Sequence, residues 1–565
     1  MSEQTKLLID SSKDLADENY ELVEDLLLTD LESYLLFCTR TEKIFRQVAS
    51  EFPIIEIRPY QWEYAAVMCL RKRNIMAYEM GAGKTTCTLL CLQAIYGSWV
   101  GRNAATVHIV VPSVLSAQRW LEDLGRFSSM AGCYKLITNE KELIENTKPI
   151  IIYTQDFPKS KSKVKKDNSR PWVSRLLGRK FRPSFLVIDE VHNCQPKTKR
   201  TEHLQYLIAR SKRLLVLSGT ISEGRIVDVH NLCKLVYGKN WPFSTRERFT
   251  GKFAHQHVLS TNYLYGSRLG NEVREVQRRS IQQLNPLLLA DYYWLVRRFI
   301  HRVKLTDPRV RCCITVPREE LVLEVLEPSE EQRKQHQEYI LGKRKEIEEA
   351  VRTVGIKQKA AALRIINPLI ELANSSLCSN SKVERTYQIV TQSTGKVVIF
   401  ASYIKSANRI SAYLTERLGS SSVVRVYATD EEASVKKQSI ENRILAVEEF
   451  QFNPNVKVGV FAINLASESI DLTSAKDVIY YCLPWSSKKL RQSINRVVRP
   501  GNYSKTVNVH LLYHRGLIDE HQVSLATEKI RGSRLIEDYE VEDRSGELEE
   551  EYGQSDIFRK LLERL

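Results

Sequence analysis

Short apolar runs rich in β-branched residues recur in two parts of the chain, and polar or helical sequence follows each run. In the first part the runs cover 108–113, 150–154, 185–188 and 214–220, and in the second part they cover 396–402, 456–462 and 477–482. Residues 114–121 follow the first run with apolar side chains at helical spacing. Because buried strands that alternate with helices are typical of parallel sheets covered on both faces, this pattern predicts an α/β fold with doubly wound parallel sheets.

The stretch between these two parts lacks the strand rhythm. It carries long charged segments at 330–339 and 343–349, which are typical of exposed helices that bridge two lobes. A chain of 565 residues is also too long for one hydrophobic core. The sequence therefore predicts five parts, which are an N-terminal helical segment (1–50), a first lobe (51–240), a helical inter-lobe region (241–390), a second lobe (391–520) and an acidic tail with a terminal helix (521–565).

Net charge, the length of apolar runs and the spacing of cysteines limit which classes of protein fit this sequence. The formal net charge of +16 favours a polyanionic partner such as nucleic acid. The polar start of the chain and the lack of an apolar run of ~18 residues predict a soluble intracellular protein with no membrane segment. The 11 cysteines include no CxxC pair, so we expect buried, reduced thiols rather than a metal site.

Residues 74–86 form an apolar run that ends in a glycine-rich turn and a Lys-Thr pair. In such a turn backbone N–H groups surround a triphosphate, the Lys84 ammonium lies beside the β and γ phosphates, and the Thr85 hydroxyl binds Mg²⁺. The predicted nucleotide-binding residues of this turn are Met80, Gly81, Ala82, Gly83, Lys84, Thr85 and Thr86. Tyr78 stands where the P-loop pattern has a glycine, and a chance glycine turn that opens a helix is the alternative interpretation.

Two further segments carry candidate chemistry in the first lobe. Gln61 lies just upstream of the glycine turn, and its side chain offers a donor and an acceptor that can read the edge of an adenine, although the same hexapeptide also fits a helix start at Pro59. Asp189 and Glu190 directly follow a buried apolar run. Two carboxylates at the end of a buried strand require a positive partner. Mg²⁺ held by Asp189 would supply the positive charge, and Glu190 would activate a water.

A pair of arginines is the candidate chemistry of the second lobe. Arg496 and Arg499 lie three residues apart, so on a helix they would project from one face. Arginines presented in this way can reach the γ-phosphate held by the other lobe and stabilise the charge of the transition state. A basic helix with this spacing by chance is the alternative interpretation.

Taken together, these segments resemble the ATPase core of helicase superfamily two and, within it, the Swi/Snf-type DNA translocases. The resemblance runs from about Ile57 to Asp519. It rests on residues 58–61 (Arg58 to Gln61) for the adenine-side motif, 79–85 for the phosphate loop, 189–192 with the basic 193–199 for the Mg²⁺ and water-activating motif, 218–220 for the coupling motif, and Gln492, Arg496 and Arg499 for the glutamine and the paired arginine fingers.

The resemblance implies two tandem RecA-like domains that use ATP and Mg²⁺ and close cyclically on double-stranded DNA. It implies that Lys84, Asp189, Glu190, Gln492, Arg496 and Arg499 carry catalysis and that Arg58 and Gln61 contact the nucleotide. The expected function is therefore an ATP-dependent translocase that moves on double-stranded DNA and remodels protein–DNA complexes or assists transcription. Transcription or chromatin proteins are the expected protein partners, and no membrane is expected. Such a protein would lie in the nucleus, or in the cytoplasm or a virion if a DNA virus or cytoplasmic plasmid encodes it.

The sequence departs from the family pattern at its fifth motif. Residues 466–473 contain no glycine, and Asp471 replaces the usual asparagine. Glu468 would repel a nearby DNA strand, and Val498 stands where a histidine is usual between the two arginines. These changes concern the coupling of ATP to DNA. Two alternatives to the translocase stay open, and the altered motif bears on the second of them. One is a helicase that separates the strands of DNA or RNA, and the other is a non-catalytic scaffold in a transcription or chromatin complex.

Overall fold

The computed structural model describes residues 57–538, apart from gaps at 97–98, 100, 128–129, 160–176, 178–179, 195–197, 223, 255–256, 268–269, 281–283, 353–355, 375–380, 427–439 and 464–469. The chain divides into two compact units. The first extends to Ser222 and adds 226–253 and 285–314, and the second comprises 223–225, 254–284 and everything from Thr315 onward. Each unit contains its own parallel sheet.

The first unit is built on a sheet of seven strands in the order β3-β4-β2-β5-β6-β1-β9. Every neighbouring pair in this sheet is parallel. The strands are β1 (Arg73–Tyr78), β2 (Val107–Val111), β3 (Tyr134–Leu136), β4 (Ile150–Thr154), β5 (Phe185–Ile188), β6 (Arg213–Ser218) and β9 (Ile300–Val303). All residues of β2 and β5 are buried, as expected for strands covered on both faces.

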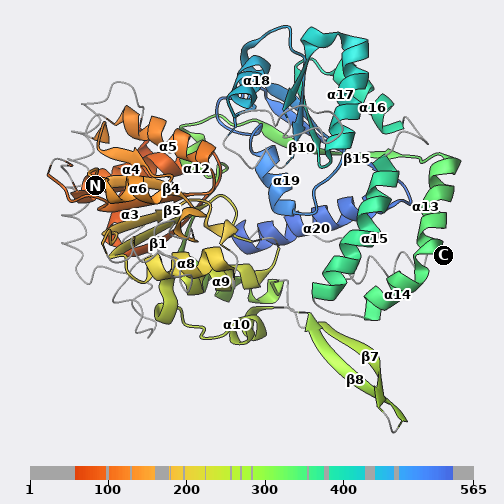
Figure 1. The fold of residues 1–565 in the computed structure, drawn as a ribbon, viewed down its shortest axis with the longest axis horizontal. Helices are drawn as coiled ribbons and strands as arrows, with labels where there is room; N and C mark the ends of the chain where they lie inside the picture. Colours follow the sequence, from red (N-terminus) through yellow and green to blue (C-terminus); the bar gives the residue numbers. More distant parts are fainter. Residues whose placement is uncertain are drawn as a thin grey trace. The chain divides into compact units, whose positions relative to one another are not determined.

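Helices cover the first sheet on both sides, with α4 and α5 on one side and α8 and α9 on the other (Figure 1). The α-helices of this unit are α3 (Pro59–Leu70), α4 (Lys84–Tyr96), α5 (Val114–Arg126), α6 (Glu140–Ile144), α8 (Lys199–Ile208), α9 (Ile226–Tyr237), α10 (Arg246–Phe253), α11 (Leu289–Val296) and α12 (Pro308–Arg311). Local sequence explains α5 well. The Ser113 side chain accepts a hydrogen bond from the Ser116 N–H at 3.2 Å and caps the helix, while Trp120 and Leu124 face the core.

The second unit is built on a sheet of six parallel strands in the order β10-β15-β14-β11-β13-β12. These strands are β10 (Arg318–Leu326), β11 (Lys396–Ala401), β12 (Val423–Val426), β13 (Val458–Ala462), β14 (Ala475–Tyr480) and β15 (Thr506–His514). The helices are α13 (Glu330–Gly342), α14 (Arg344–Arg352), α15 (Ile356–Asn374), α16 (Ser381–Gln392), α17 (Ile404–Leu418), α18 (Ile440–Phe452), α19 (Ser487–Ile494) and α20 (Ile518–Asp538). An antiparallel hairpin, β7 (His257–Ser267) and β8 (Gly270–Ser280), also belongs to this unit.

Alternate residues of β11 show that both faces of the second sheet are buried. Val397 and Ile399 belong to a core cluster shared with α16 and α17. Val398 and Phe400 belong to a second cluster shared with α18, α19 and α20. The prediction of an α/β fold with two doubly wound parallel sheets is therefore confirmed.

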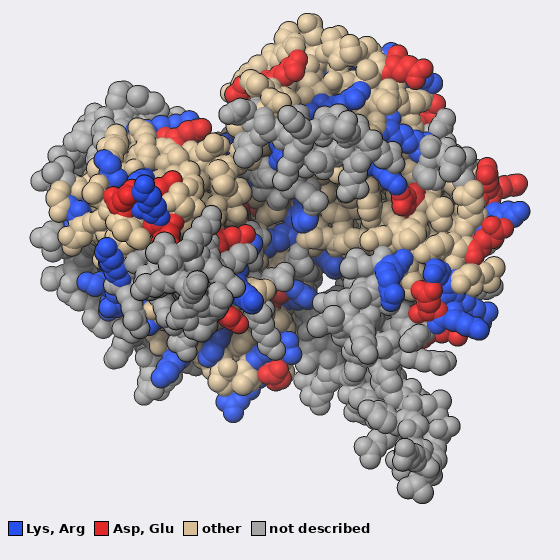
Figure 2. Space-filling model, viewed as in Figure 1, with Lys and Arg blue, Asp and Glu red and all other residues tan. Residues whose placement is uncertain are grey.

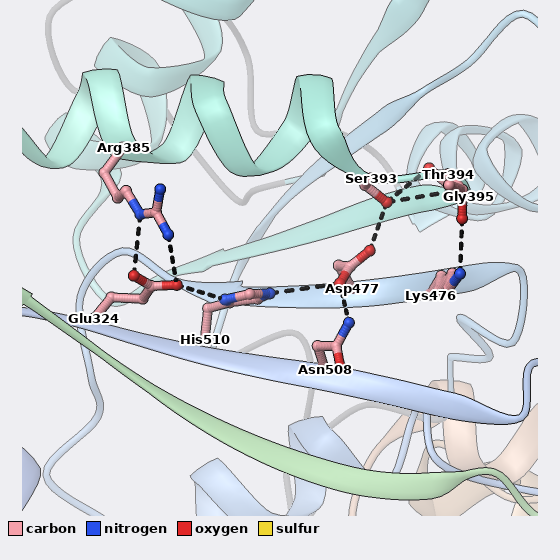
Figure 3. Close-up of polar contacts among 9 residues, drawn as sticks. All are labelled: Glu324, Arg385, Ser393, Thr394, Gly395, Lys476, Asp477, Asn508 and His510. Carbon is pink, nitrogen blue, oxygen red and sulfur yellow. Dashed lines mark hydrogen bonds and ion pairs between the residues drawn. The ribbon is translucent and has the colours of Figure 1, made fainter.

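A polar network fixes the edge strand β10 to its neighbours in the second unit (Figure 3). His510 of β15 lies between two carboxylates, with Nδ1 2.9 Å from Glu324 Oε1 and Nε2 3.4 Å from Asp477 Oδ1. Arg385 of α16 donates to both carboxylate oxygens of Glu324, at 3.0 and 3.2 Å. Asn508 and Ser393 donate to Asp477. Each buried charge in this network therefore has a charged or hydrogen-bonding partner.

The stretch 241–390 differs from the helical region that its sequence predicts. It contains helices, but also β9, which joins the first sheet, and β10, which joins the second. Strand β10 turns Glu324 inward toward Arg385 and leaves Leu321, Leu323 and Val325 42–49% exposed at the sheet edge. In most strands with one buried face, the apolar side chains point inward and the polar ones outward. Strand β10 has the opposite arrangement, so its sequence pattern did not indicate a strand.

Several predicted features lie outside the described residues. They are the N-terminal segment 1–50, most of the basic run at 159–166, Glu468, and most of the acidic tail with the terminal helix at 557–565. The predicted domain boundaries remain predictions. Among the residues that the structure describes, none of the helices combines the length and the apolar character that crossing a bilayer demands.

Candidate nucleotide-hydrolysis site

The glycine turn lies between the end of β1 and the start of α4, which begins at Lys84. Gly81 and Gly83 have φ angles of +90° and +86°, a region that residues with a side chain rarely adopt. A Cβ atom placed on Gly83 would lie 2.2 Å from Nε2 of Gln61, so both conformation and space require glycine. The turn thus presents its backbone at the N-terminus of a 13-residue helix, where anions bind favourably.

The two residues that flank this turn have distinct environments. The Lys84 ammonium donates to the Tyr78 carbonyl oxygen at 2.9 Å and therefore lies within the turn. The Tyr78 side chain is fully buried, and its hydroxyl lies 2.8 Å from Nδ1 of His301. The tyrosine that departs from the P-loop pattern therefore belongs to the core of the first unit, where its ring packs against Tyr64.

The segment upstream of the turn contacts it directly. The Tyr60 hydroxyl donates to the Ala82 carbonyl oxygen at 3.3 Å, and Gln61 is 3% exposed. The Arg58 backbone N–H donates to Oε1 of Gln61 at 3.0 Å, and the Gln61 backbone N–H donates to the Arg58 carbonyl oxygen at 2.9 Å, so both contacts fix the start of α3. Pro59 occupies the first turn of the helix. The helix-start interpretation is therefore confirmed, and nucleotide contact by Arg58 and Gln61 remains a prediction.

Asp189 and Glu190 follow the last residue of β5, at the carboxyl edge of the sheet. The Trp120 indole N–H donates to Oδ2 of Asp189 at 3.0 Å, and the Glu190 backbone N–H donates to Oδ1 at 2.9 Å. Gln155 Nε2 donates to the Asp189 carbonyl oxygen at 2.7 Å. Burial, helped by the nearby Glu190 charge, raises the pKa of Asp189 to about 6, although the Trp120 hydrogen bond and the Lys84 charge oppose this shift.

Glu190 has a strained backbone, and its side chain lies beside His192. Its φ and ψ angles of 48° and 51° are left-handed, which typically costs a non-glycine residue roughly 1–3 kcal/mol. Its Oε2 atom lies 3.0 Å from Nδ1 of His192, and the same nitrogen lies 2.8 Å from the Ser218 hydroxyl. Ser218 in turn donates to the Thr220 carbonyl oxygen at 2.6 Å. His192 thus connects the acidic pair to the Ser-Gly-Thr segment at the end of β6.

The residues at this edge fit a divalent cation. Asp189 is a half-buried carboxylate with a raised pKa and a second carboxylate beside it, so added positive charge would favour its ionised form. Thr85 lies half-buried at the start of α4. No cluster of three or more His, Cys, Asp or Glu side chains with metal-binding geometry occurs among the described residues. Mg²⁺ suits such a site, because it commonly takes one or two protein oxygens and completes its shell with phosphates and waters.

Several residues that the sequence analysis did not select lie in the same site. Arg302 of β9 donates to the carbonyl oxygens of Ala77 and Gly219 at 3.1 and 3.2 Å, and lies 3.5 Å from Oε1 of Glu79. The other oxygen of Glu79 accepts from the Leu305 backbone N–H at 2.7 Å. Arg302 therefore joins the start of the phosphate loop to the Ser-Gly-Thr segment. Its position on a short strand far along the chain gave no sequence signal.

The candidate residues of the second unit are not on one helical face. Gln492 is buried on α19, but that helix ends at Ile494, and both arginines lie in the turn that follows it. Val497 and Val498 are buried in the core, and Pro500 disfavours helical backbone in the residue before it. The prediction that Arg496 and Arg499 project from a helix was wrong. Arg496 is 8% exposed, and Nη1 of Arg499 forms an ion pair with Asp471.

Two family models match the chain one after the other. The model of the SNF2-related domain matches residues 60–379, and the model of the helicase conserved C-terminal domain matches residues 381–501. "DNA annealing helicase and endonuclease ZRANB3" of Mus musculus is 24% identical over 85% of this chain and 41% of that protein. "Uncharacterized ATP-dependent helicase YqhH" of Bacillus subtilis is 23% identical over 84% of this chain and 78% of that protein.

A solved structure of the Sulfolobus solfataricus SWI2/SNF2 ATPase core in complex with dsDNA is 20% identical, covers 86% of this chain and 93% of its own, and gives a TM-score of 0.35. The chain spans about two-fifths of the length of the mouse relative. The SNF2-related model alone covers more than half of the 565 residues. The chain therefore belongs to the SNF2-related family, the Swi/Snf type of helicase superfamily two.

Proposed function

We propose that the protein hydrolyses ATP to move along double-stranded DNA and remodel protein–DNA complexes or assist transcription. One observation carries this proposal. The phosphate loop, the acidic pair after β5 and the segment after β6 meet at one edge of the first sheet. A Cβ on Gly219 would lie 3.6 Å from the Lys84 ammonium, whose charge also acts on Asp189. In parallel sheets ligands bind at this carboxyl edge.

The first unit would hold and cleave the nucleotide. The loop residues 80–86 would surround the phosphates, with the Lys84 ammonium beside the β and γ phosphates. Thr85 and Asp189 would hold Mg²⁺, which when bound would neutralise charge on the phosphate oxygens. Glu190 would orient the attacking water and accept its proton. His192 lies beside this group, with Nδ1 3.0 Å from the Glu190 carboxylate.

The second unit would contribute during turnover. Gln492, Arg496 and Arg499 are proposed to complete catalysis, with the two guanidinium groups stabilising negative charge on the transferred phosphate. Where such arginines have been removed in other enzymes, rates fall roughly 10³–10⁵-fold. Arg496 and Arg499 belong to one turn that is bound firmly to the core of its unit, which suits a role that depends on fixed geometry.

Double-stranded DNA is the proposed substrate surface. The net charge of +16 and the family assignment support a polyanionic partner, and the name of the mouse relative describes action on DNA. On the face drawn in Figure 2, lysine and arginine side chains are interspersed with acidic ones on each unit. Binding through many phosphate contacts, without base readout, fits a distributed positive charge. We propose the nucleus as the compartment and transcription or chromatin proteins as partners.

The test is a comparison of ATP turnover in the presence of double-stranded DNA, single-stranded DNA and RNA over a series of salt concentrations. We expect the highest turnover with double-stranded DNA, and a steep loss of stimulation as salt rises, because contacts to phosphate release counterions. A fluorescent duplex placed ahead of the enzyme tests strand separation. Preferential stimulation by RNA, or efficient unwinding of the duplex, would contradict translocation on intact double-stranded DNA.

A further inference from the structure

The turn that carries both candidate arginines, residues 495–502, is bound to the segment 470–475 by backbone and amide contacts. The Leu472 backbone N–H donates to the Arg496 carbonyl oxygen at 3.0 Å. The Asn502 side-chain amide donates to one carbonyl oxygen of each segment, at 2.8 and 3.0 Å. Leu472 is fully buried and Asn502 is 2% exposed. These contacts make the two segments one structural element of the second unit.

An ion pair adds a different kind of contact to this element. The Arg499 guanidinium donates through Nη1 to Oδ1 of Asp471. The Arg499 side chain is 17% exposed and the Asp471 side chain 36% exposed, so water can replace either partner. Unlike the buried contacts around it, this pair can therefore separate without unfolding the element. Asp471 is also the residue at which the chain departs from the family's asparagine.

We propose that Asp471 is a positioning residue for Arg499, a role that rests on the proposed ATPase function. Between turnovers the Asp471 carboxylate binds the Arg499 guanidinium. The guanidinium separates from this carboxylate when Arg499 acts on the transferred phosphate. An asparagine would keep the shape and a hydrogen-bond acceptor but would lack the charge. The ion pair must break before the catalytic step, so its stability adds to the barrier. For a partly exposed ion pair this lowers the rate of that step by a factor of about two to five.

Steady-state ATP hydrolysis by the full chain tests this role. Asp471→Asn should raise kcat about two- to fivefold, both with and without double-stranded DNA, because release from the carboxylate no longer opposes the catalytic step. The KM for ATP should not change, because the nucleotide-binding residues lie in the first unit. Asp471→Glu keeps the charge and should restore the wild-type kcat. Glu448→Gln, which removes one exposed carboxylate from α18, is the matched control and should leave kcat unchanged.

Three results would overturn the proposal. They are an unchanged or lower kcat for Asp471→Asn, an equal rise for Asp471→Glu, and an equal rise for the control. A solely structural role for Asp471 would lower kcat and stability together.

A second measurement separates failure of this inference from failure of the proposed function. Denaturation midpoints of Asp471→Asn, Arg499→Gln and the double variant form a cycle that needs no activity. If the two residues form a pair in solution, the double variant loses less stability than the sum of the single variants. Additive losses would overturn the pair whatever the ATPase result. If the cycle shows coupling but the wild type hydrolyses no ATP under any condition, the proposed function fails.

Discussion

Replacing His510 with glutamine should make the stability of the second unit less dependent on pH. Burial alone lowers the pKa of His510, but its hydrogen bonds to Asp477 and Glu324 outweigh burial and raise the pKa above its usual value. The pKa values of Glu324 and Asp477 shift in the opposite sense. Burial alone would raise both, but hydrogen bonds from Arg385 and His510 to Glu324, and from His510 and Ser393 to Asp477, lower them.

The sign of the pH effect follows from these directions. A raised pKa means that the His510 contribution is complete below pH ~6.5, the usual histidine value, and is lost as the pH rises through the raised pKa. A lowered pKa means that the contributions of Glu324 and Asp477 are present above their usual values near pH ~4 and are lost at lower pH. All three contributions therefore act together near pH ~6.

The magnitude can be worked from the contacts in Figure 3. His510 is 12% exposed and makes one charged hydrogen bond at 2.9 Å and a longer contact at 3.4 Å. Hydrogen bonds to charged groups contribute about 1.5–3 kcal/mol, and glutamine can retain one neutral hydrogen bond worth about 1 kcal/mol. The variant should therefore lose roughly 1–3 kcal/mol at pH ~6, which lowers the Tm of a unit of this size by about 2–10 °C.

Differential scanning calorimetry of the full chain at pH ~6 and pH ~8.5 tests this prediction. The Tm difference between wild type and His510→Gln should be largest at the lower pH and shrink at the higher pH, where His510 is neutral. His203→Gln, which removes a half-exposed histidine from α8 in the first unit, is the control and should not reproduce this trend. Equal Tm differences at both pH values would refute the charged network.

Three further predictions concern the candidate site. Gly83→Ala should abolish ATP binding, measured by calorimetry, because the new Cβ would overlap Gln61 at 2.2 Å and the backbone has positive φ; normal affinity would contradict the described turn. Arg302→Gln should weaken ATP binding about tenfold or more, because two carbonyl oxygens at the site each lose a charged hydrogen bond. Trp120→Phe removes a hydrogen bond that lowers the pKa of Asp189, so the acid limb of kcat/KM should move upward from pH ~6; an unmoved limb would contradict the assignment.

The sequence predicted those parts of the site whose chemistry lies in short contiguous segments. The phosphate loop and the Asp189–Glu190 pair each follow a buried apolar run, so both the strand and the end of the sheet could be inferred. Arg302 and Trp120 could not be found in this way. They reach the site from β9 and α5, and only the order of strands in the folded sheet brings them to it.

The errors in the second unit have a similar origin. The spacing of Arg496 and Arg499 fits a helix, but α19 ends at Ile494, and the turn that follows it buries Val497 and Val498 between the two arginines. Strand β10 was missed because its inward residue is Glu324, whose partner Arg385 lies about sixty residues away. Local patterns identify residues that face an apolar core, and they fail where a distant charge provides the partner.

The most direct test of the ATPase site measures hydrolysis by wild type, Lys84→Ala and Glu190→Gln with saturating double-stranded DNA. We expect DNA-stimulated turnover in the wild type and a loss of at least about 10²-fold in both variants. Glu190→Gln should still bind ATP, since it removes the proton acceptor and keeps the phosphate loop. Wild-type turnover in both variants would show that hydrolysis occurs elsewhere and would contradict the assignment of this site.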